Sequence, residues 1–298
     1  MKICKIIGFV FLSIVLGKII DYCDSKEWSV WSNIAGILLG MSLPSVWHSI
    51  QDLYDTTNWQ VSQRKLLRGK VITNDTNVRI SFAYLFRIKV GDKYLLVRNN
   101  RGTEKFQPVG GVYQFKRGEK NELKRLYNVI DDNKIPIDES SRDDYRLRMA
   151  NKYLRKFVKR FDGKARREQI DNLGREFKEE LIDTGIVNWT KIKYRVCGRH
   201  MTELRFSEHF QIYELLLADV VELMPTVEQE NDLRKLMCTQ SDAYYFATEE
   251  EIKSLGIDTT ARKLKEIIGD HTLKTLQENE GKLVNVPGAN ETYTINLV

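Results

Sequence analysis

The sequence predicts an α+β protein with two regions of different character: an N-terminal hairpin of two transmembrane helices and a larger domain of strands and helices. Two apolar runs, at about residues 3–20 and 28–47, each suit one bilayer span of roughly 20 residues. Farther along, β-rich runs alternate with amphipathic segments, and 298 residues with 42% apolar composition can bury a sizeable core. The net charge of +6 suits an anionic partner without distinguishing nucleotide, nucleic acid and lipid.

The second apolar run contains no charged residue and is bounded by tryptophans, as in an aromatic belt: Trp28, Trp31 and Trp47. Gly36 and Gly40 form a GxxxG motif that can allow close helix packing. Lysines and arginines precede the first run and follow the second, so we expect a multi-pass protein with both termini cytoplasmic. No small-residue cleavage site follows the first run, which argues against a signal peptide. A soluble helical hairpin is the remaining alternative.

Residues 51–72 are interpreted as a linker, and residues 73–298 as one domain with an insertion at about 120–168. The domain begins with strand-like runs at 78–90 and 93–98, and the Gly91-Asp92 pair between them indicates a hairpin. A further strand is predicted at 106–113, interrupted at Gly110 and Gly111. The four cysteines form no CxxC pair, so neither a zinc site nor a disulfide framework is predicted.

The insertion combines a predicted loop at 131–141 with a predicted helix at 143–161. The helix would bury an apolar stripe made of Ala150, Tyr153, Leu154, Phe157, Val158 and Phe161. Between residues 142 and 167 there are eleven lysines and arginines against three aspartates, giving 11 − 3 = +8. This basic segment is interpreted as a solvated face, a phosphate-binding wall or a contact with anionic lipid.

The last third of the chain predicts a sheet followed by short helices. Strands are expected at 191–196, 210–217 and 243–246, and the apolar 210–217 run suits the centre of a sheet. Thr248 with Glu251 forms a capping box that should begin a helix. A last helix is predicted at 259–268, and residues 284–298 are expected to form a strand pair or a loop.

Between these regions lies an acidic helix, predicted from Arg175-Glu176-Phe177-Lys178-Glu179-Glu180-Leu181. Its three glutamates are spaced i, i+3 and i+4, so they should share one helical face. The opposite face repeats apolar residues that should meet a core: Ile170, Leu173, Phe177 and Leu181. Carboxylate oxygens are preferred ligands of Mg²⁺ and Mn²⁺, so a metal site is one interpretation and a solvated acidic face the other.

This stretch resembles the Nudix box, in which a glycine turn is followed by Glu and then by Arg-Glu-apolar-x-Glu-Glu. The run 106–111 (Phe-Gln-Pro-Val-Gly-Gly) resembles the strand and turn that open the box, and Gly185-Ile186 resembles its closing pair. Glu119 resembles the next glutamate, displaced by two residues. Unlike the continuous family motif, a long insertion separates Glu119 from Arg175 here. The resemblance implies a Nudix-like α/β/α sandwich with a mixed sheet and a helical insertion.

A two-span hairpin joined to an interrupted Nudix domain resembles the two-transmembrane effectors with a SMODS-associated Nudix domain of bacterial CBASS anti-phage systems. That resemblance implies a sensor of a cyclic oligonucleotide made by a partner nucleotidyltransferase. Ligand binding would assemble homo-oligomers whose spans disrupt the inner-membrane bilayer. The expected ligand-binding residues are Gly110, Gly111, Arg155, Lys156, Lys159 and Arg160.

The alternative is a membrane-anchored Mg²⁺- or Mn²⁺-dependent Nudix pyrophosphohydrolase of a nucleoside diphosphate derivative. The resemblance would then give Glu176, Glu179 and Glu180 as metal ligands. Glu179, Glu180 and Arg175 would be the catalytic residues. The sequence leaves open whether the domain hydrolyses anything.

Overall fold

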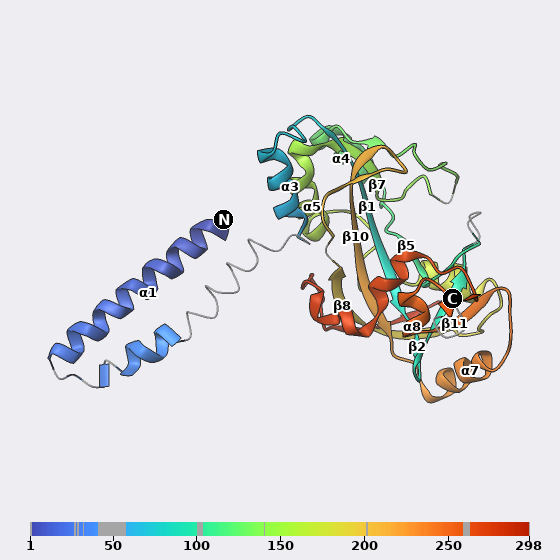
Figure 1. Cartoon of the computed structure of the whole chain (residues 1–298). Coiled ribbons are helices and arrows are strands. Elements are labelled where there is room, and N and C mark those ends of the chain that lie inside the picture. The colour runs from blue at the N-terminus through green and yellow to red at the C-terminus, as the bar shows by residue number, and fades with distance from the viewer. Residues whose placement is uncertain are drawn as a thin grey trace. The chain divides into compact units, whose positions relative to one another are not determined.

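The computed structural model describes residues 2–26, 28, 30–31, 33–40, 58–99, 104–139, 141–200, 202–258 and 263–297. They belong to two compact units, Met1–Lys65 and Leu66–Val298, which are described separately (Figure 1). In the first unit, helix α1 covers Lys2–Ser25, and residues 33–40 are also helical. Helix α3, Trp59–Arg68, spans the boundary between the two units.

The predicted transmembrane hairpin is wrong for the described residues, because none of their helices is long and apolar enough to cross a membrane. Side chains of α1 are described from residue 11 onward, and this part includes the charged Lys18, Asp21 and Asp24. A span needs roughly 20 predominantly apolar residues. The predicted second span continues into residues 41–47, which lie outside the described residues. The predicted multi-pass inner-membrane location is overturned by the same finding.

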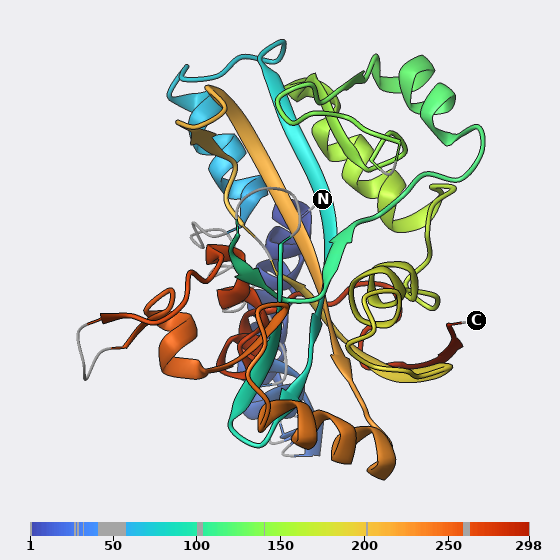
Figure 2. The same ribbon diagram turned by 90° about the vertical axis from the view of Figure 1, so that its right-hand side faces the viewer.

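The second unit is built on an eight-stranded mixed sheet with the path β14-β8-β10-β1-β7-β6, to which β5 adds on β1 and β9 on β10. The two long central strands, β1 and β10, run parallel side by side, and the other pairings are antiparallel (Figure 2). The strands are β1 Asn77–Arg87, β5 Gly110–Val112, β6 Ile130–Asp131, β7 Arg146–Ala150, β8 Lys191–His200, β9 Arg205–Ser207, β10 Ile212–Leu223 and β14 Thr292–Asn296.

A smaller sheet of four strands packs its own core. Its strands are β2 Lys89–Val90, β3 Lys93–Arg98, β4 Phe106–Gln107 and β11 Tyr244–Thr248. Tyr94 and Leu96 of β3 bury against Phe106 of β4 and Ile252 of the short helix α8 (Glu249–Lys253). A separate pair of short strands consists of β12 Ile257–Asp258 and β13 Lys263–Leu264.

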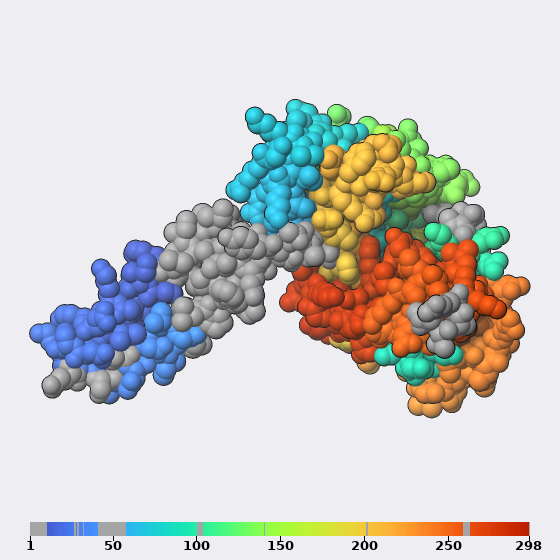
Figure 3. Space-filling view, in the orientation of Figure 1, coloured from blue at the N-terminus to red at the C-terminus, as the bar shows by residue number. Residues whose placement is uncertain are grey.

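Helical segments lie on both faces of the large sheet. On one face, Phe82 of β1 stacks on Phe161 of α5 (Leu154–Gly163), and Phe86 of the same strand meets Phe177 of α6 (Arg175–Phe177). On the other face, Arg87 donates to carbonyl groups of the C-terminal 3₁₀ helix η3 (Asp270–Thr275) and the residue that follows it. In the space-filling view of Figure 3, C-terminal residues in red lie beside orange ones of the same unit. The remaining helices are α4 Glu119–Tyr127, η1 Asn151–Tyr153, η2 Lys178–Ile182, α7 Val227–Met237 and η4 Gln277–Lys282.

Several sequence predictions agree with this fold. The β2–β3 hairpin turns at Gly91, β10 lies between β8 and β1, and Thr248 caps α8 through the predicted box with Glu251. The helix predicted at 143–161 is wrong over its first half, because residues 146–150 form β7 and pair with β1. The last predicted helix is wrong where it is described, since residues 263–264 are a strand.

Candidate functional site

Two glycines of β5 face two glutamates of the acidic helix. The backbone N–H of Gly110 donates a 2.9 Å hydrogen bond to Glu180 Oε2. A Cβ atom on Gly111 would lie 1.8 Å from Glu176 Oε1. Gly110 has φ +148°, and a Cβ there would lie 2.2 Å from the Tyr84 carbonyl oxygen. Both positions therefore need glycine, because carboxylates or backbone approach them too closely for a side chain.

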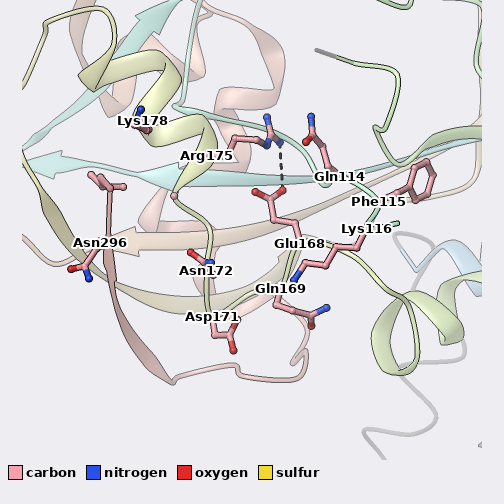
Figure 4. A pocket seen from close by; sticks show the side chains of 12 residues that line it. Gln114, Phe115, Lys116, Glu168, Gln169, Asp171, Asn172, Arg175, Lys178 and Asn296 are labelled. Carbon is pink, nitrogen blue, oxygen red and sulfur yellow. Dashed lines mark hydrogen bonds and ion pairs between the residues drawn. The ribbon is translucent and has the colours of Figure 1, made fainter. Parts of the chain in front are cut away.

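Arg175 holds this part of the site together. Its guanidinium pairs with Glu176 at 2.7 Å and donates to the Val112 carbonyl oxygen at 2.8 Å. It also pairs with Glu168 at 3.4 Å, as the dashed line in Figure 4 shows. The hydroxyl of Tyr84 donates to the other oxygen of Glu168 at 3.2 Å. Arg175 thus ties the glycine strand, the acidic helix and the loop before it to one another.

Burial governs the ionisation of these groups. It raises the pKa of Glu168 above its usual value, although the nearby positive charge of Arg175 opposes the shift. Burial, followed by repulsion from Glu168, raises the pKa of the Tyr84 hydroxyl. Burial alone would lower the pKa of Arg175, but Tyr84, Glu176 and Glu168 outweigh it and raise that pKa. Arg175 therefore stays charged.

The three glutamates of the acidic helix have different partners. After α6 the helix widens into the π turn η2, in which the N–H of Asp183 donates to the carbonyl oxygen of Lys178. Glu176 is buried against Arg175, Glu180 accepts from Gly110, and Glu179 is 49% exposed. Within the described part of the chain, no three acidic, histidine or cysteine side chains are arranged to hold an ion. The assignment of these three glutamates as metal ligands stays a prediction.

A cavity of about 650 Å³ opens beside Arg175. Its walls come from the segment after β5, the loop before α6 and the end of β14 (Figure 4). Of the predicted site residues, Arg175 is the one that the described lining includes; the three glutamates of the helix lie outside it. The lining residues are Gln114, Phe115, Lys116, Glu168, Gln169, Asp171, Asn172, Gly174, Arg175, Lys178, Asn296 and Leu297.

The basic residues predicted on the insertion divide into two kinds. Arg155, Lys156 and Lys159 lie on the exposed side of α5. Arg160 instead makes a two-pronged pair with the fully buried Glu119, at 2.8 and 2.9 Å. Arg160 and Glu119 therefore join α5 to α4 inside the domain.

Sequence reasoning missed Glu168, whose carboxylate reaches Arg175. The sequence places position 168 at the end of the predicted insertion, directly after the basic segment. The signal available in the sequence is that Glu168 lies seven residues before Arg175, so that a short loop can bring its carboxylate back to the helix. That loop is held by Tyr194, whose hydroxyl accepts from the Leu173 N–H at 3.0 Å.

A mixed α+β domain in which a Gly-Gly strand faces an Arg-Glu-Phe-Lys-Glu-Glu helix defines the class as Nudix-like. Residues 77–276 match the SMODS-associated NUDIX domain, which is more than half of the 298 residues. The chain therefore belongs to the SMODS-associated NUDIX family. No curated protein matches it.

Two solved structures are similar to the chain at low identity. One is described as a UDP-X diphosphatase, with 11% identity, 92% of this chain and 95% of that chain covered, and a TM-score of 0.25. The other is a NUDIX-family hydrolase from Clostridium perfringens, with 14% identity, 70% and 98% covered, and a TM-score of 0.18.

Proposed function

We propose that this chain is the sensor of a CBASS-type antiviral defence system, and that its Nudix domain binds a cyclic oligonucleotide second messenger. Its membership in the SMODS-associated family supports this context. The functional partner would be a nucleotidyltransferase that makes the ligand. Binding would favour a self-assembled state, because a ligand shifts a protein only toward the state that it binds better.

The observation that carries the proposal is how the carboxylates of the acidic helix are occupied. Glu180 accepts from the Gly110 N–H at 2.9 Å, and Glu176 pairs with Arg175 at 2.7 Å. These contacts use the carboxylates to fix the glycine strand against the helix. The neighbouring cavity, by contrast, offers amide and cationic groups to a ligand. We therefore assign recognition, rather than metal-assisted hydrolysis, to this site.

Positive charge near the site suits a phosphate-containing ligand. Lys116, Arg175 and Lys178 line the cavity. The exposed side of α5 adds Arg155 and Lys159 to the same domain. Such groups attract anions and can make charge-assisted hydrogen bonds to phosphate oxygens.

A Nudix pyrophosphohydrolase is the second candidate. It is favoured by the Arg175-Glu176-Phe177 helix start. Nudix hydrolases generally use divalent metals such as Mg²⁺ or Mn²⁺, and a hydrolytic site here would need one. In the sensor function the Glu180 carboxylate instead serves to hold the Gly110 N–H. The proposal therefore predicts that a metal adds no turnover.

The full chain separates the two functions in one pair of assays. Thermal unfolding is followed with cyclic di- and trinucleotides, and product release is followed with Mn²⁺ and a panel of nucleoside diphosphate derivatives. We expect stabilisation by at least one cyclic oligonucleotide without turnover, since a ligand at 100 times its Kd adds about 2.7 kcal/mol to the folded state. Turnover that disappears in Glu179→Gln, without stabilisation by any cyclic oligonucleotide, would overturn the sensor function.

A further inference from the structure

Four amide side chains line the cavity beside Arg175: Gln114, Gln169, Asn172 and Asn296. An amide presents a donor and an acceptor side by side, as bidentate recognition of a base edge requires. Phe115 belongs to the same lining, and its ring packs on the ring of Tyr145, with the two ring centroids 4.1 Å apart. The volume of about 650 Å³ falls in the range typical of small-molecule sites, about 300–1,000 Å³.

Backbone hydrogen bonds hold the wall that carries the aromatic ring. The N–H of Phe115 donates to the Asp143 carbonyl oxygen at 2.7 Å, and the N–H of Lys116 donates to the Arg166 carbonyl oxygen at 2.8 Å. This wall is therefore fixed by backbone partners in two parts of the insertion, one in its middle and one near its end.

The opposite wall is fixed by a single tyrosine. Tyr194 donates its hydroxyl to the Ile170 carbonyl oxygen at 2.9 Å and accepts from the Leu173 N–H at 3.0 Å. These bonds flank Asn172, whose own side chain is exposed to the cavity side of the loop. Because both walls are held before any ligand arrives, little ordering has to accompany binding.

The lining has a small positive balance. Three cations, Lys116, Arg175 and Lys178, stand against the two carboxylates Glu168 and Asp171, giving 3 − 2 = +1. Of the two carboxylates, Glu168 already pairs with Arg175 and accepts a hydrogen bond from the Tyr84 hydroxyl. Figure 4 shows the charged and amide side chains around one space.

We infer that this cavity binds one nucleotide unit of the ligand, with the base edge read by Asn172 and the phosphate meeting Lys116. The inference rests on the proposed function, in which the larger ligand that contains this nucleotide unit is a cyclic oligonucleotide. It concerns the cavity lining and uses none of the glutamates of the acidic helix.

The test uses the full chain and measures binding of AMP, GMP, CMP, UMP and ribose 5-phosphate, together with the cyclic oligonucleotides. We expect at least one mononucleotide to bind more tightly than ribose 5-phosphate, which lacks a base. Asn172→Leu should weaken that mononucleotide roughly tenfold and leave ribose 5-phosphate unchanged. Lys116→Ala should weaken all the phosphate compounds.

Asn188→Leu and Lys193→Ala are the matched controls, because both residues are exposed and lie outside the cavity lining. Each should bind as the unsubstituted chain does, and unliganded thermal unfolding checks that all four variants fold. Asn172→Leu lies on an exposed loop position and should fold normally.

Two outcomes separate this inference from the proposed function. Base-dependent mononucleotide binding that requires Asn172, without binding of any cyclic oligonucleotide, supports the cavity and rejects the sensor function. Binding of a cyclic oligonucleotide that is equally tight in Asn172→Leu and Lys116→Ala rejects the cavity and leaves the sensor function standing. Mononucleotides that bind no better than ribose 5-phosphate also reject the cavity.

Discussion

The backbone N–H of Gly110 donates to Glu180 Oε2 across 2.9 Å, although 70 positions separate the two residues. Next to this contact, Gly111 leaves the space into which the Glu176 carboxylate fits. These contacts join β5, which precedes the long insertion, to the acidic helix, which follows it. The insertion can leave the Nudix arrangement intact because these contacts do not depend on the chain between them.

Gly111→Ala should destabilise the domain. Its Cβ would lie 1.8 Å from Glu176 Oε1, so the carboxylate and its Arg175 pair would have to move. We expect a loss of about 1–3 kcal/mol in the free energy of unfolding, measured by urea denaturation. Gly163→Ala is the control, because among the described atoms nothing lies within 4 Å of a Cβ there. Equal stability of the two variants would contradict the close approach of Gly111 and Glu176.

Glu119→Ala should be more damaging than a neighbouring exposed change. Glu119 is fully buried, and Arg160, its partner, is 17% exposed. Removing one member leaves a buried charge unpaired, so we expect a loss of about 3–5 kcal/mol in the free energy of unfolding. Glu122→Ala on the same helix breaks the exposed pair with Arg125 and should cost far less. A Glu119→Ala loss as small as the Glu122→Ala loss would show that the pair is not structural.

Local signals predicted the elements that depend on adjacent residues. The Gly91 turn, the capping box of Thr248 with Glu251 and the apolar β10 run each carry their own physical reason within a few residues. The β7 strand has no such local reason. Its five residues alternate between half-buried and buried because β7 pairs with β1 in the sheet. The predicted helix at 143–161 includes these five residues because the strong helical pattern of α5 follows them closely.

The site was predictable for its motif but not for its partners. Gly110, Gly111 and the acidic helix could be associated through the family pattern. That Glu168 reaches Arg175, and that Glu119 instead pairs with Arg160, depends on where the insertion folds. The π turn that carries Glu179 and Glu180 also has no clear local signal in the sequence. Tertiary packing decides all three features.

Acid should weaken the domain through His200. Burial, with repulsion from Lys274 and Lys282, lowers the pKa of this histidine to about 4. An unfolded histidine has a pKa of about 6.5, so between pH 6.5 and 4 the unfolded state binds a proton that the folded state refuses. The free energy of unfolding should therefore fall as pH falls through that window, by at most about 1.4 kcal/mol per pH unit from this group.

The measurement is urea denaturation between pH 7 and pH 4.5, for the unsubstituted chain and for His200→Gln. The variant lacks the titrating group, so its unfolding free energy should depend less steeply on pH over this range. Asp270 does not interfere, because its pKa is lowered to about 2. Identical pH slopes for the two proteins would show that His200 is freely protonated in the folded state.

Glu179 and Glu180 should respond differently to substitution, although a metal-binding helix would need both. Glu179 is 49% exposed and its pair with Arg175 is 3.6 Å long, so Glu179→Gln should change the free energy of unfolding by about 0–1 kcal/mol. Glu180→Ala removes the acceptor of the Gly110 N–H and should cost about 1–3 kcal/mol. Urea denaturation of both variants measures the difference.

Ligand binding extends the same comparison. If the carboxylates serve to hold the glycine strand, Glu179→Gln should keep the thermal stabilisation by a cyclic oligonucleotide unchanged, because Glu179 does not line the described cavity. Glu180→Ala should lose part of it, because the strand that leads to Gln114 and Phe115 is no longer tied to the helix. If the helix instead holds a metal for hydrolysis, either substitution should abolish turnover, and the two variants would then be indistinguishable in activity whatever their stability.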